Sequence, residues 1–490
     1  MIAPWARDEM ATVNLHDRRL NERLIEVLSN LAARPTASIP AASGGRAEMT
    51  ATYRLFDNAK ATYANILEPH AAQTRARVQA QSVVLCVQDT SEIDLTRPQQ
   101  PVVGAGPLAE ESRQGFFLHL NEAFTTDGTP LGQVWSHTWA RDPADPALTP
   151  EAKRQQRRAA PIEDKESFRW LAGLRQTRAL AAQCPATTCV CVADSEADIY
   201  ELFAEPRGTA HPVQFLIRLC QNRALAPDAA DADADAAEQA RLIRERVAAN
   251  PVRFTKEITV RGRTAKVACE QRGRRQSRQG RQTQVAVRAT TLTLRPPARP
   301  DRQLPELTVQ VVLVQEVHPP AGEEPVEWLL ITTLPIDSDD QVRTIIAYYC
   351  VRWVIELFFR VLKSGCRVEQ RRFERLERLE RCLAVYVIVA WRTLYVCRLG
   401  RSCPDLDCTA VFEPSEWKAV WMVIHRQAPP EQPPTLAEFI RLVAQLGGYV
   451  NRPEREDPPG PQTVWLGLQR MYDLAWGWET FGPGAPNPHV

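Results

Sequence analysis

Residues 83–89, VVLCVQD, and residues 189–194, CVCVAD, are short segments that begin with a continuous apolar run and end in an aspartate. Valine-rich runs of this length are typical of strands that are buried on both faces of a sheet. Together with the strand-like segments at 115–141 and the helix-like segment at 165–184, the two runs predict an α/β core. Ligands of open α/β sheets bind at the carboxyl ends of strands, which makes Asp89 and Asp194 candidate site residues. Strand-end aspartates also serve as helix caps and turn residues, so neither position alone assigns a function.

Both ends of the chain are predicted to be helical. Residues 1–80 carry apolar residues at helical spacing in LNERLIEVLSNLAA (20–33) and again across residues 47–80, so we expect an N-terminal helical domain. The run CLAVYVIVAW at 382–391 predicts a buried helix, because it is much shorter than the roughly 20 residues of a membrane span. Residues 401–490 are punctuated by proline and are predicted to form a C-terminal helical domain.

Residues 81–400 form the predicted α/β core. Strand-like segments between residues 115 and 141 flank Asp127-Gly128, which predicts a β-hairpin. His119 lies inside the first of these strands and is expected to be a hydrogen-bonded core residue. Residues 142–162 are rich in proline and charge and are predicted to be a loop, and an amphipathic helix is expected at 165–184.

Residues 220–335 predict a β-rich domain inserted into this core. An acidic low-complexity segment at 228–239 and a basic segment at 272–282 interrupt the strand patterns of the insertion. The basic segment either contacts phosphates or is a solvated loop. The expected strands are EITVRG (257–262), KVACEQ (266–271), TQVAVRATTLTLR (283–295), ELTVQVVLVQEV (306–317) and VEWLLITTLP (326–335).

Composition places the chain among ordinary globular proteins. With 490 residues it is too long for one compact core, and its net charge of +1 points to no particular partner. The first residues mix acidic and basic side chains without an apolar segment, so we expect no signal peptide, no membrane and a cytoplasmic location. The 12 cysteines lie mostly in apolar runs and lack paired CxxC spacing, so we expect reduced thiols rather than a zinc site.

The segment YYCVRWVIELFFRVLKSG, residues 348–365, predicts a helix with one polar stripe. At about 100° per residue its polar side chains fall within a stripe about 80° wide, opposite an apolar arc. The stripe surrounds a single carboxylate with cations and a phenol, although a solvent-facing stripe of an amphipathic helix would give the same pattern. It consists of Tyr349, Arg352, Glu356, Arg360 and Lys363.

Glu356 joins Asp89 and Asp194 as a third widely separated carboxylate. Clustered carboxylates repel one another, and hard divalent cations such as Mg²⁺ or Mn²⁺ relieve that repulsion. Two such ions activate an attacking oxygen and stabilise a leaving oxygen in phosphoryl transfer. The three carboxylates therefore predict a two-metal site that acts on phosphodiesters, beside cations that bind phosphates.

These residues carry a resemblance to a known family. Residues 349–363 have the spacing Y-x-x-R-x-x-x-E-x-x-x-x-x-x-K and follow the two aspartates in the order Asp, Asp, Glu. The arrangement resembles the DDE transposases of insertion-sequence family four, a bacterial cut-and-paste group with a Tyr-Arg-Glu-Lys signature. The resemblance extends from about residue 10 to residue 478. Further matching segments are ATYRLFDN (51–58), CVQDTSEIDL (86–95), GFFLHL (115–120), KESFRWLA (165–172), VADSEADIYEL (192–202), PPAGEEPVEWLLITTLP (319–335) and LGGYVNR (446–452).

The resemblance implies an α/β protein with a ribonuclease H-like core at 81–400, which contains the β-rich insertion domain at 220–335. Residues 1–80 would bind transposon ends, and residues 401–490 would form a dimerisation region. Asp89, Asp194 and Glu356 would be catalytic and would hold two Mg²⁺ ions, with Mn²⁺ able to substitute. The residues implied to contact DNA are Tyr349, Arg352, Lys363 and Arg360 on phosphates, Trp328 on a flipped base, and Arg218 at the end of the strand QFLIR.

The implied activity is DNA transposition by a homodimer associated with the bacterial nucleoid. The enzyme would bind double-stranded DNA at terminal inverted repeats, cleave both strands through a hairpin intermediate and join the 3′-OH ends to target DNA. A metal-dependent nuclease with the same core, or a former transposase kept as a DNA-binding protein, would share most of these features. A metal-dependent phosphatase for small substrates fits the large insertion and the cationic helix less well. The acidic and basic segments of the insertion have no counterpart in the resemblance.

Overall fold

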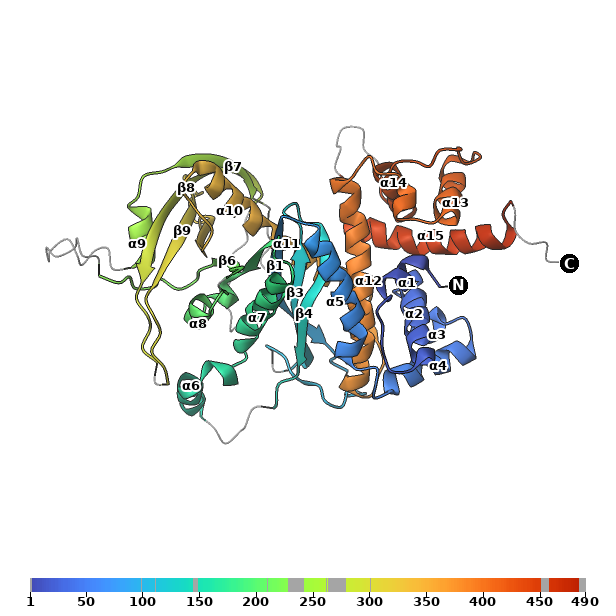
Figure 1. The fold of residues 1–490 in the computed structure, drawn as a ribbon, viewed down its shortest axis with the longest axis horizontal. Helices are drawn as coiled ribbons and strands as arrows, with labels where there is room; N and C mark the ends of the chain where they lie inside the picture. Colours follow the sequence, from blue (N-terminus) through green and yellow to red (C-terminus); the bar gives the residue numbers. More distant parts are fainter. Residues whose placement is uncertain are drawn as a thin grey trace. The chain divides into compact units, whose positions relative to one another are not determined.

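The computed structural model describes residues 2–97, 99–110, 112–143, 149–208, 210–227, 242–260, 262, 279–299, 301–450 and 458–483. The chain divides into two compact units. Unit 1 contains Met1–Pro146 and Trp353–Val490, and unit 2 contains Ala147–Arg352. Each unit combines helices with strands, so the expected mixed α/β class is confirmed (Figure 1). The acidic segment 228–239, the expected strand 266–271 and most of the basic segment 272–282 lie outside the described residues.

Unit 1 begins with the expected helices. The prediction of one continuous helical period across residues 47–80 is wrong, because two polar side chains between the helices bind backbone amides instead. Asn58 accepts a hydrogen bond from the Lys60 amide at 2.9 Å, and Thr62 accepts one from the Asn65 amide at 3.1 Å. These helices are α1 (Pro4–Glu9), α2 (Arg18–Ala33), α3 (Ile39–Ala42), α4 (Arg46–Asp57) and α5 (Tyr63–Gln79).

The strands of unit 1 pair in an antiparallel manner. They are β1 (Val83–Asp94), β2 (Gly106–Pro107), β3 (Gln114–Phe124) and β4 (Pro130–Trp139), and β3 pairs with each of the other three. The hairpin predicted around Asp127-Gly128 is confirmed as the β3–β4 connection, in which Gly128 has a φ of +88°. The apolar run of β1 ends at Asp89 as expected, but the strand itself continues to Asp94. The strand continues because its pairing with β3 continues: Asp89 pairs with Leu120, and Asp94 pairs with Gly115.

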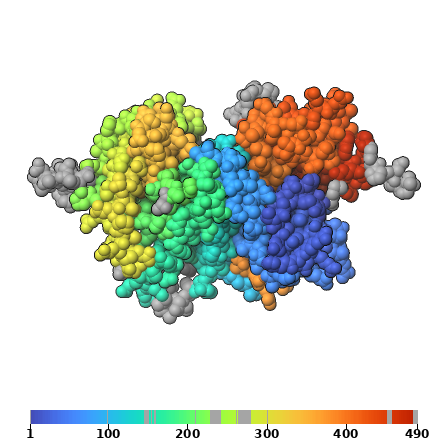
Figure 2. All heavy atoms as spheres, viewed as in Figure 1, coloured from blue at the N-terminus to red at the C-terminus, as the bar shows by residue number. Residues whose placement is uncertain are grey.

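Helix α12 (Leu376–Ser402) is the central helix of unit 1, and residues 382–391 are all buried, which confirms the predicted buried helix. Among the described residues it alone is long and apolar enough to cross a membrane, and 78% of that apolar stretch is buried inside the structure. The helices α13 (Pro414–His425), α14 (Leu436–Leu446) and α15 (Pro461–Phe481) share a hydrophobic core with its last turns. Figure 2 shows this C-terminal part in orange and red.

Unit 2 begins with a helix where the sequence predicted a loop. Residues 142–162 contain α6 (Pro150–Ala159), so the loop prediction is wrong for these ten residues. Pro150 occupies the first helical position, where a missing amide hydrogen costs nothing. The Thr149 hydroxyl accepts a hydrogen bond from the Ala152 amide at 3.2 Å and caps the helix. The expected helix at 165–184 is present as α7 (Phe168–Gln183).

The strands of unit 2 form one mixed sheet, with both parallel and antiparallel neighbours. Strand β5 (Thr188–Ala193) pairs in parallel with β6 (Gln214–Arg218), and β6 pairs with β10 (Glu327–Thr332) in an antiparallel manner. Beyond β10 lie β9 (Leu307–Glu316), β8 (Arg281–Leu294) and β7 (Phe254–Val260), all antiparallel (Figure 1). The predicted strands of the insertion that are described thus continue the sheet of β5 and β6. The shorter helical elements of this unit are η1 (Ile162–Asp164), η2 (Ser195–Ala197), α8 (Tyr200–Ala204) and α9 (Ile243–Ala248).

The prediction of one regular helix at 348–365 is wrong. Helix α10 (Asp339–Val351) ends before Arg352, α11 (Trp353–Arg360) follows, and the π-helical turn η3 (Val361–Gly365) continues from α11. The Cys366 amide donates to the Val361 carbonyl at 2.8 Å, which inserts one residue relative to α-helical spacing. The predicted polar stripe is therefore not one solvent-facing surface. Tyr349 and Arg352 are only 5% and 8% exposed, whereas Arg360 is exposed.

Candidate functional site

Two neighbouring strand ends in unit 2 carry a carboxylate and a guanidinium. Because β5 and β6 run in parallel with Ala193 opposite Ile217, the next residues, Asp194 and Arg218, lie at the same edge of the sheet. The Asp194 carboxylate accepts a hydrogen bond from the Glu196 amide at 2.9 Å and caps η2. Both side chains are half-buried. The structure thus places the predicted aspartate at a strand end, as expected, with the predicted cation next to it.

Two aromatic rings and a second guanidinium complete this arrangement. Leu330 of β10 pairs with Arg218, so Trp328, two residues earlier, is directed to the same face of the sheet. The Trp328 and Tyr349 rings meet edge to face, with centroids 5.6 Å apart and an interplanar angle of 60°. We call Arg218, Trp328, Tyr349 and Arg352, together with Asp194, the aromatic–cation cluster.

Charge in the cluster acts on the Tyr349 phenol. Burial raises the pKa of Tyr349, and the positive charges of Arg352 and Arg218 oppose that rise while the Asp194 carboxylate adds to it. The phenol therefore stays protonated at neutral pH and can donate a hydrogen bond to an anionic oxygen. Within the described residues its hydroxyl has no hydrogen bond of normal geometry, although Arg218 lies beside it. The cluster offers two cations, a neutral phenol and an aromatic ring around one carboxylate.

The other two predicted carboxylates belong to unit 1. Asp89 lies on β1 at the point where the buried run of that strand ends, and its carboxylate accepts a hydrogen bond from the Thr90 amide at 2.7 Å. Glu356 lies in the first turn of α11, which packs against β1, and is half-buried. His119, on the neighbouring strand, is completely buried and contacts the Thr90 hydroxyl at 2.8 Å and the Gln88 side chain at 3.0 Å. The expectation of a satisfied core histidine is therefore confirmed.

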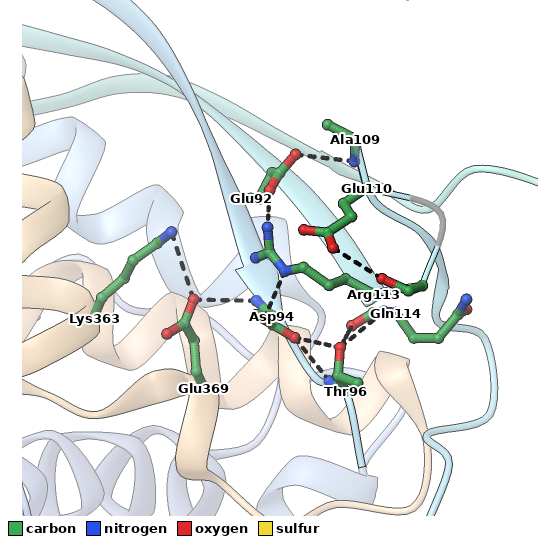
Figure 3. Close-up of polar contacts among 10 residues, drawn as sticks. Glu92, Asp94, Thr96, Ala109, Glu110, Arg113, Gln114, Lys363 and Glu369 are labelled. Carbon is green, nitrogen blue, oxygen red and sulfur yellow. Dashed lines mark hydrogen bonds and ion pairs between the residues drawn. The ribbon is translucent and has the colours of Figure 1, made fainter. Parts of the chain in front are cut away.

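Both remaining predicted phosphate ligands have protein partners. The Arg360 guanidinium donates to the side-chain oxygen of Gln462 at 2.9 Å. The Lys363 ammonium forms an ion pair with Glu369 at 3.5 Å, and the same Glu369 oxygen accepts a hydrogen bond from the Asp94 amide at 3.1 Å (Figure 3). Glu369 was not predicted from the sequence, because only the chain reversal after Gly365 brings it back to Lys363.

Further charged groups surround the end of β1. Arg113 bridges the carboxylates of Glu92 at 3.0 Å and Asp94 at 2.9 Å (Figure 3). Burial would raise the pKa of Asp94, but hydrogen bonds from Thr96 and Arg113 outweigh burial and lower it. Asp94 is therefore ionised at neutral pH and committed to these partners. This network holds the end of β1 in place beside Lys363. Within it, Glu92 pairs with Arg113, whereas Lys363 pairs with Glu369.

The predicted metal ligands are divided between the units, with Asp89 and Glu356 in unit 1 and Asp194 in unit 2. Within the described ranges no three His, Cys, Asp or Glu side chains already form a metal-binding group. The predicted ligands supply only carboxylate oxygens, and this donor chemistry fits Mg²⁺ or Mn²⁺. Most of the cysteines that the structure describes are buried.

Comparisons with known proteins match three successive parts of the chain. The model for a transposase DNA-binding domain matches residues 2–61, the model for a transposase DDE domain matches residues 172–391, and the model for the transposase Tn5 dimerisation domain matches residues 388–478. The whole aromatic–cation cluster lies within the DDE match, and so does Glu356, whereas Asp89 precedes it.

Among solved structures, the cryo-EM structure of the piggyBac transposase synaptic complex with hairpin DNA is similar to this chain at 9% sequence identity and a TM-score of 0.36. The similarity covers 82% of this chain and 72% of that chain. The domain assignment rests on the three family models. By its DNA-binding, DDE and dimerisation domains, the chain is a DNA transposase of the DDE class.

Proposed function

We propose that this transposase belongs to the cut-and-paste kind of insertion-sequence family four and acts on the terminal inverted repeats of its own element in the bacterial cytoplasm. The observation that carries the proposal is the aromatic–cation cluster around Asp194, within a chain that has a DDE domain. It places a carboxylate, cations and an aromatic ring at the carboxyl ends of β5 and β6. That combination suits a phosphodiester next to an unstacked base.

Each member of the cluster has a proposed task on DNA. Arg218 and Arg352 neutralise phosphate oxygens, for which a guanidinium is well shaped. The buried, protonated Tyr349 donates to a further oxygen. The half-buried Trp328 ring is held in an edge-to-face contact with Tyr349, so a flipped base can stack on it without first ordering the ring. Stacking of this kind is worth about 1–3 kcal/mol per base.

In this proposal Asp89, Asp194 and Glu356 hold two divalent ions, Mg²⁺ or Mn²⁺, in a ribonuclease H-like core. When bound, such ions activate the attacking oxygen and neutralise charge at the phosphate. The three carboxylates bind them, while the cations of the chain hold the DNA backbone in line for attack. Positioning and charge neutralisation account for most of the catalysis of phosphoryl transfer.

The proposed reaction has four displacements at phosphorus. Water attacks the phosphodiester at the transposon end and releases a 3′-OH. That hydroxyl attacks the opposite strand, which forms a hairpin and frees the element from flanking DNA. A second water opens the hairpin, and the 3′-OH then attacks target DNA. Two copies of the chain, joined through the dimerisation domain, would hold the two ends.

Asp194→Asn tests the assignment on DNA that carries the inverted repeats flanking the reading frame. We expect strand cleavage to fall by more than about a hundredfold while binding to the repeats is retained, because only the metal-binding charge is lost. The matched control is Glu196→Gln, an exposed carboxylate two residues away that pairs with Arg169 at 3.0 Å. Its cleavage should stay near that of the wild type. Cleavage by the Asp194→Asn variant at the wild-type rate would refute the assignment.

A second assay separates the related functions. A transposase joins pre-cleaved ends with a free 3′-OH to a target plasmid, whereas a nuclease with the same core cleaves without joining. A protein kept only for DNA binding would bind the repeats and do neither. Binding in each case should weaken steeply with salt, because phosphate contacts release counterions.

A further inference from the structure

Glu369 connects Lys363 to the end of β1. One of its oxygens lies 3.5 Å from the Lys363 ammonium and accepts a hydrogen bond from the Asp94 amide at 3.1 Å. Figure 3 shows the lysine directed toward Glu369, with Asp94 on the other side of the carboxylate. The carboxylate is thus attached to the backbone of β1, the strand that also bears Asp89.

The backbone around Glu369 is held independently of its side chain. Arg367 adopts a left-handed conformation with a φ of +51° and reverses the chain after η3, so that the short 3₁₀ turn η4 (Val368–Gln370) returns to β1. The Arg97 guanidinium donates to the carbonyl of Glu369 at 3.2 Å and also to the carbonyl of Arg371. Replacing the Glu369 side chain therefore leaves the path of the chain in place.

Lys363 itself lies in the π-helical turn η3, a type of turn that is frequent at functional sites. Its ammonium has three donors, and the Glu369 contact uses one of them. A lysine side chain has many rotamers, so without a partner the ammonium would occupy a wide volume of solvent. With an anchored carboxylate beside it, the ammonium stays near the end of β1 and keeps donors available for an anion.

We propose that Glu369 is a positioning residue, which holds the Lys363 ammonium beside β1 so that its remaining donors meet a phosphate of the DNA end. This inference rests on the proposed function of Lys363 as a phosphate ligand. Removing a negative charge near DNA normally strengthens binding, because the phosphates are also negative. A loss of cleavage without a loss of binding is therefore the signature of positioning, whereas damage to the fold lowers both.

The test is Glu369→Gln in the full-length protein, measured on DNA with the inverted repeats. Glutamine keeps an oxygen for the Asp94 amide and removes only the charge. We expect the cleavage rate at saturating DNA to fall by about fivefold and the affinity for the end to stay equal or increase. Glu92→Gln is the matched control, since Glu92 belongs to the same network but pairs with Arg113 rather than with Lys363. That variant should cleave at the wild-type rate.

A double-mutant cycle with Lys363→Met decides whether Glu369 acts through the lysine. If it does, Glu369→Gln has no further effect on cleavage once Lys363 is methionine. Equal fold losses in both backgrounds overturn the inference, as does a Glu369→Gln variant that cleaves at or above the wild-type rate. If Lys363→Met itself cleaves normally, the phosphate role of the lysine and the inference both fail. The Asp194→Asn result is independent of that outcome, so a failure of the proposed function is recognised separately.

Discussion

Replacing Glu9 with glutamine should loosen α1 from the rest of unit 1. Glu9 is only 5% exposed, and its carboxylate makes two contacts of 2.9 Å with the Arg77 guanidinium and one of 2.5 Å with Nδ1 of His70. Nε2 of His70 accepts a hydrogen bond from the Gln133 amide, so we place the histidine proton on Nδ1, where it is donated to Glu9. Burial lowers the pKa of His70, which is thus neutral at pH 7. The Glu9 carboxylate thus joins α1 to both His70 and Arg77 of α5.

The expected loss follows from the pKa of the carboxyl group. Burial alone would raise the pKa of Glu9, but the hydrogen bonds and charges of His70 and Arg77 lower it from 4.5 to about 2. At about 1.4 kcal/mol for each pH unit, this corresponds to roughly 3 kcal/mol. Breaking a buried ion pair by removing one partner costs about 3–5 kcal/mol, which agrees. Because the folded pKa is lowered, this stabilisation is complete above pH 4.5 and is lost as the pH falls toward 2.

Hydrogen exchange of the α1 amides measures this loss better than global unfolding, because a chain of two units need not unfold in one step. At pH 7 the Glu9→Gln variant should exchange these amides roughly a hundredfold faster than the wild type. The control is Glu22→Gln, which removes an exposed contact of 3.7 Å between α2 and Arg7 of α1 and should change exchange less than about threefold. Equal exchange in the two variants would refute the reasoning.

Three further outcomes are expected. A Cβ on Gly467 would lie 1.8 Å from the Val443 carbonyl oxygen, so Gly467→Ala should separate α14 from α15 and abolish dimers in analytical ultracentrifugation. The control is Gly477→Ala on the same helix, where a Cβ meets open space and the dimers should remain. Burial raises the pKa of Glu416 to about 7, so the wild-type thermal midpoint should fall as the pH rises from 4.5 to 7, and Glu416→Gln should reduce that fall. Trp328→Ala should slow cleavage of repeat DNA by roughly tenfold or more, and Trp328→Phe by less, in single-turnover assays.

The parts of the fold that were predictable are those determined by local pattern. The apolar run CVCVA is typical of a strand covered on both faces, and β5 ends at Ala193 as expected. The missed helix α6 depends on Thr149 and Pro150, a capping pair within a segment whose overall composition suggests a loop. The continuation of β1 beyond Asp89 depends on hydrogen bonds to β3, and a strand partner leaves no local signal in the sequence.

The same distinction applies to the candidate site. A helical wheel over residues 348–365 assumes one uniform rotation, and both the interruption at Arg352 and the π turn at Val361–Gly365 break that assumption. The sequence analysis identified these polar residues as one stripe. It did not predict that Tyr349 and Arg352 are buried whereas Arg360 is exposed. Glu369 was missed because its contact with Lys363 depends on a chain reversal rather than on helical spacing.

The position of Arg218 beside Asp194 could be predicted from the direction of the two strands that precede them. Neighbouring parallel strands end at the same edge of a sheet. The residues that follow two such strands are therefore expected to lie close together. Asp194 and Arg218 lie at the same edge for this reason, although no signal couples their positions in the sequence. The rule for parallel strands does not apply to Trp328, because β10 runs in the opposite direction. The first residues of β10, not its last, therefore lie at that edge. A chain that placed this tryptophan at the end of β10 would direct it away from the carboxylate, and the base-stacking role proposed for it would have no physical basis.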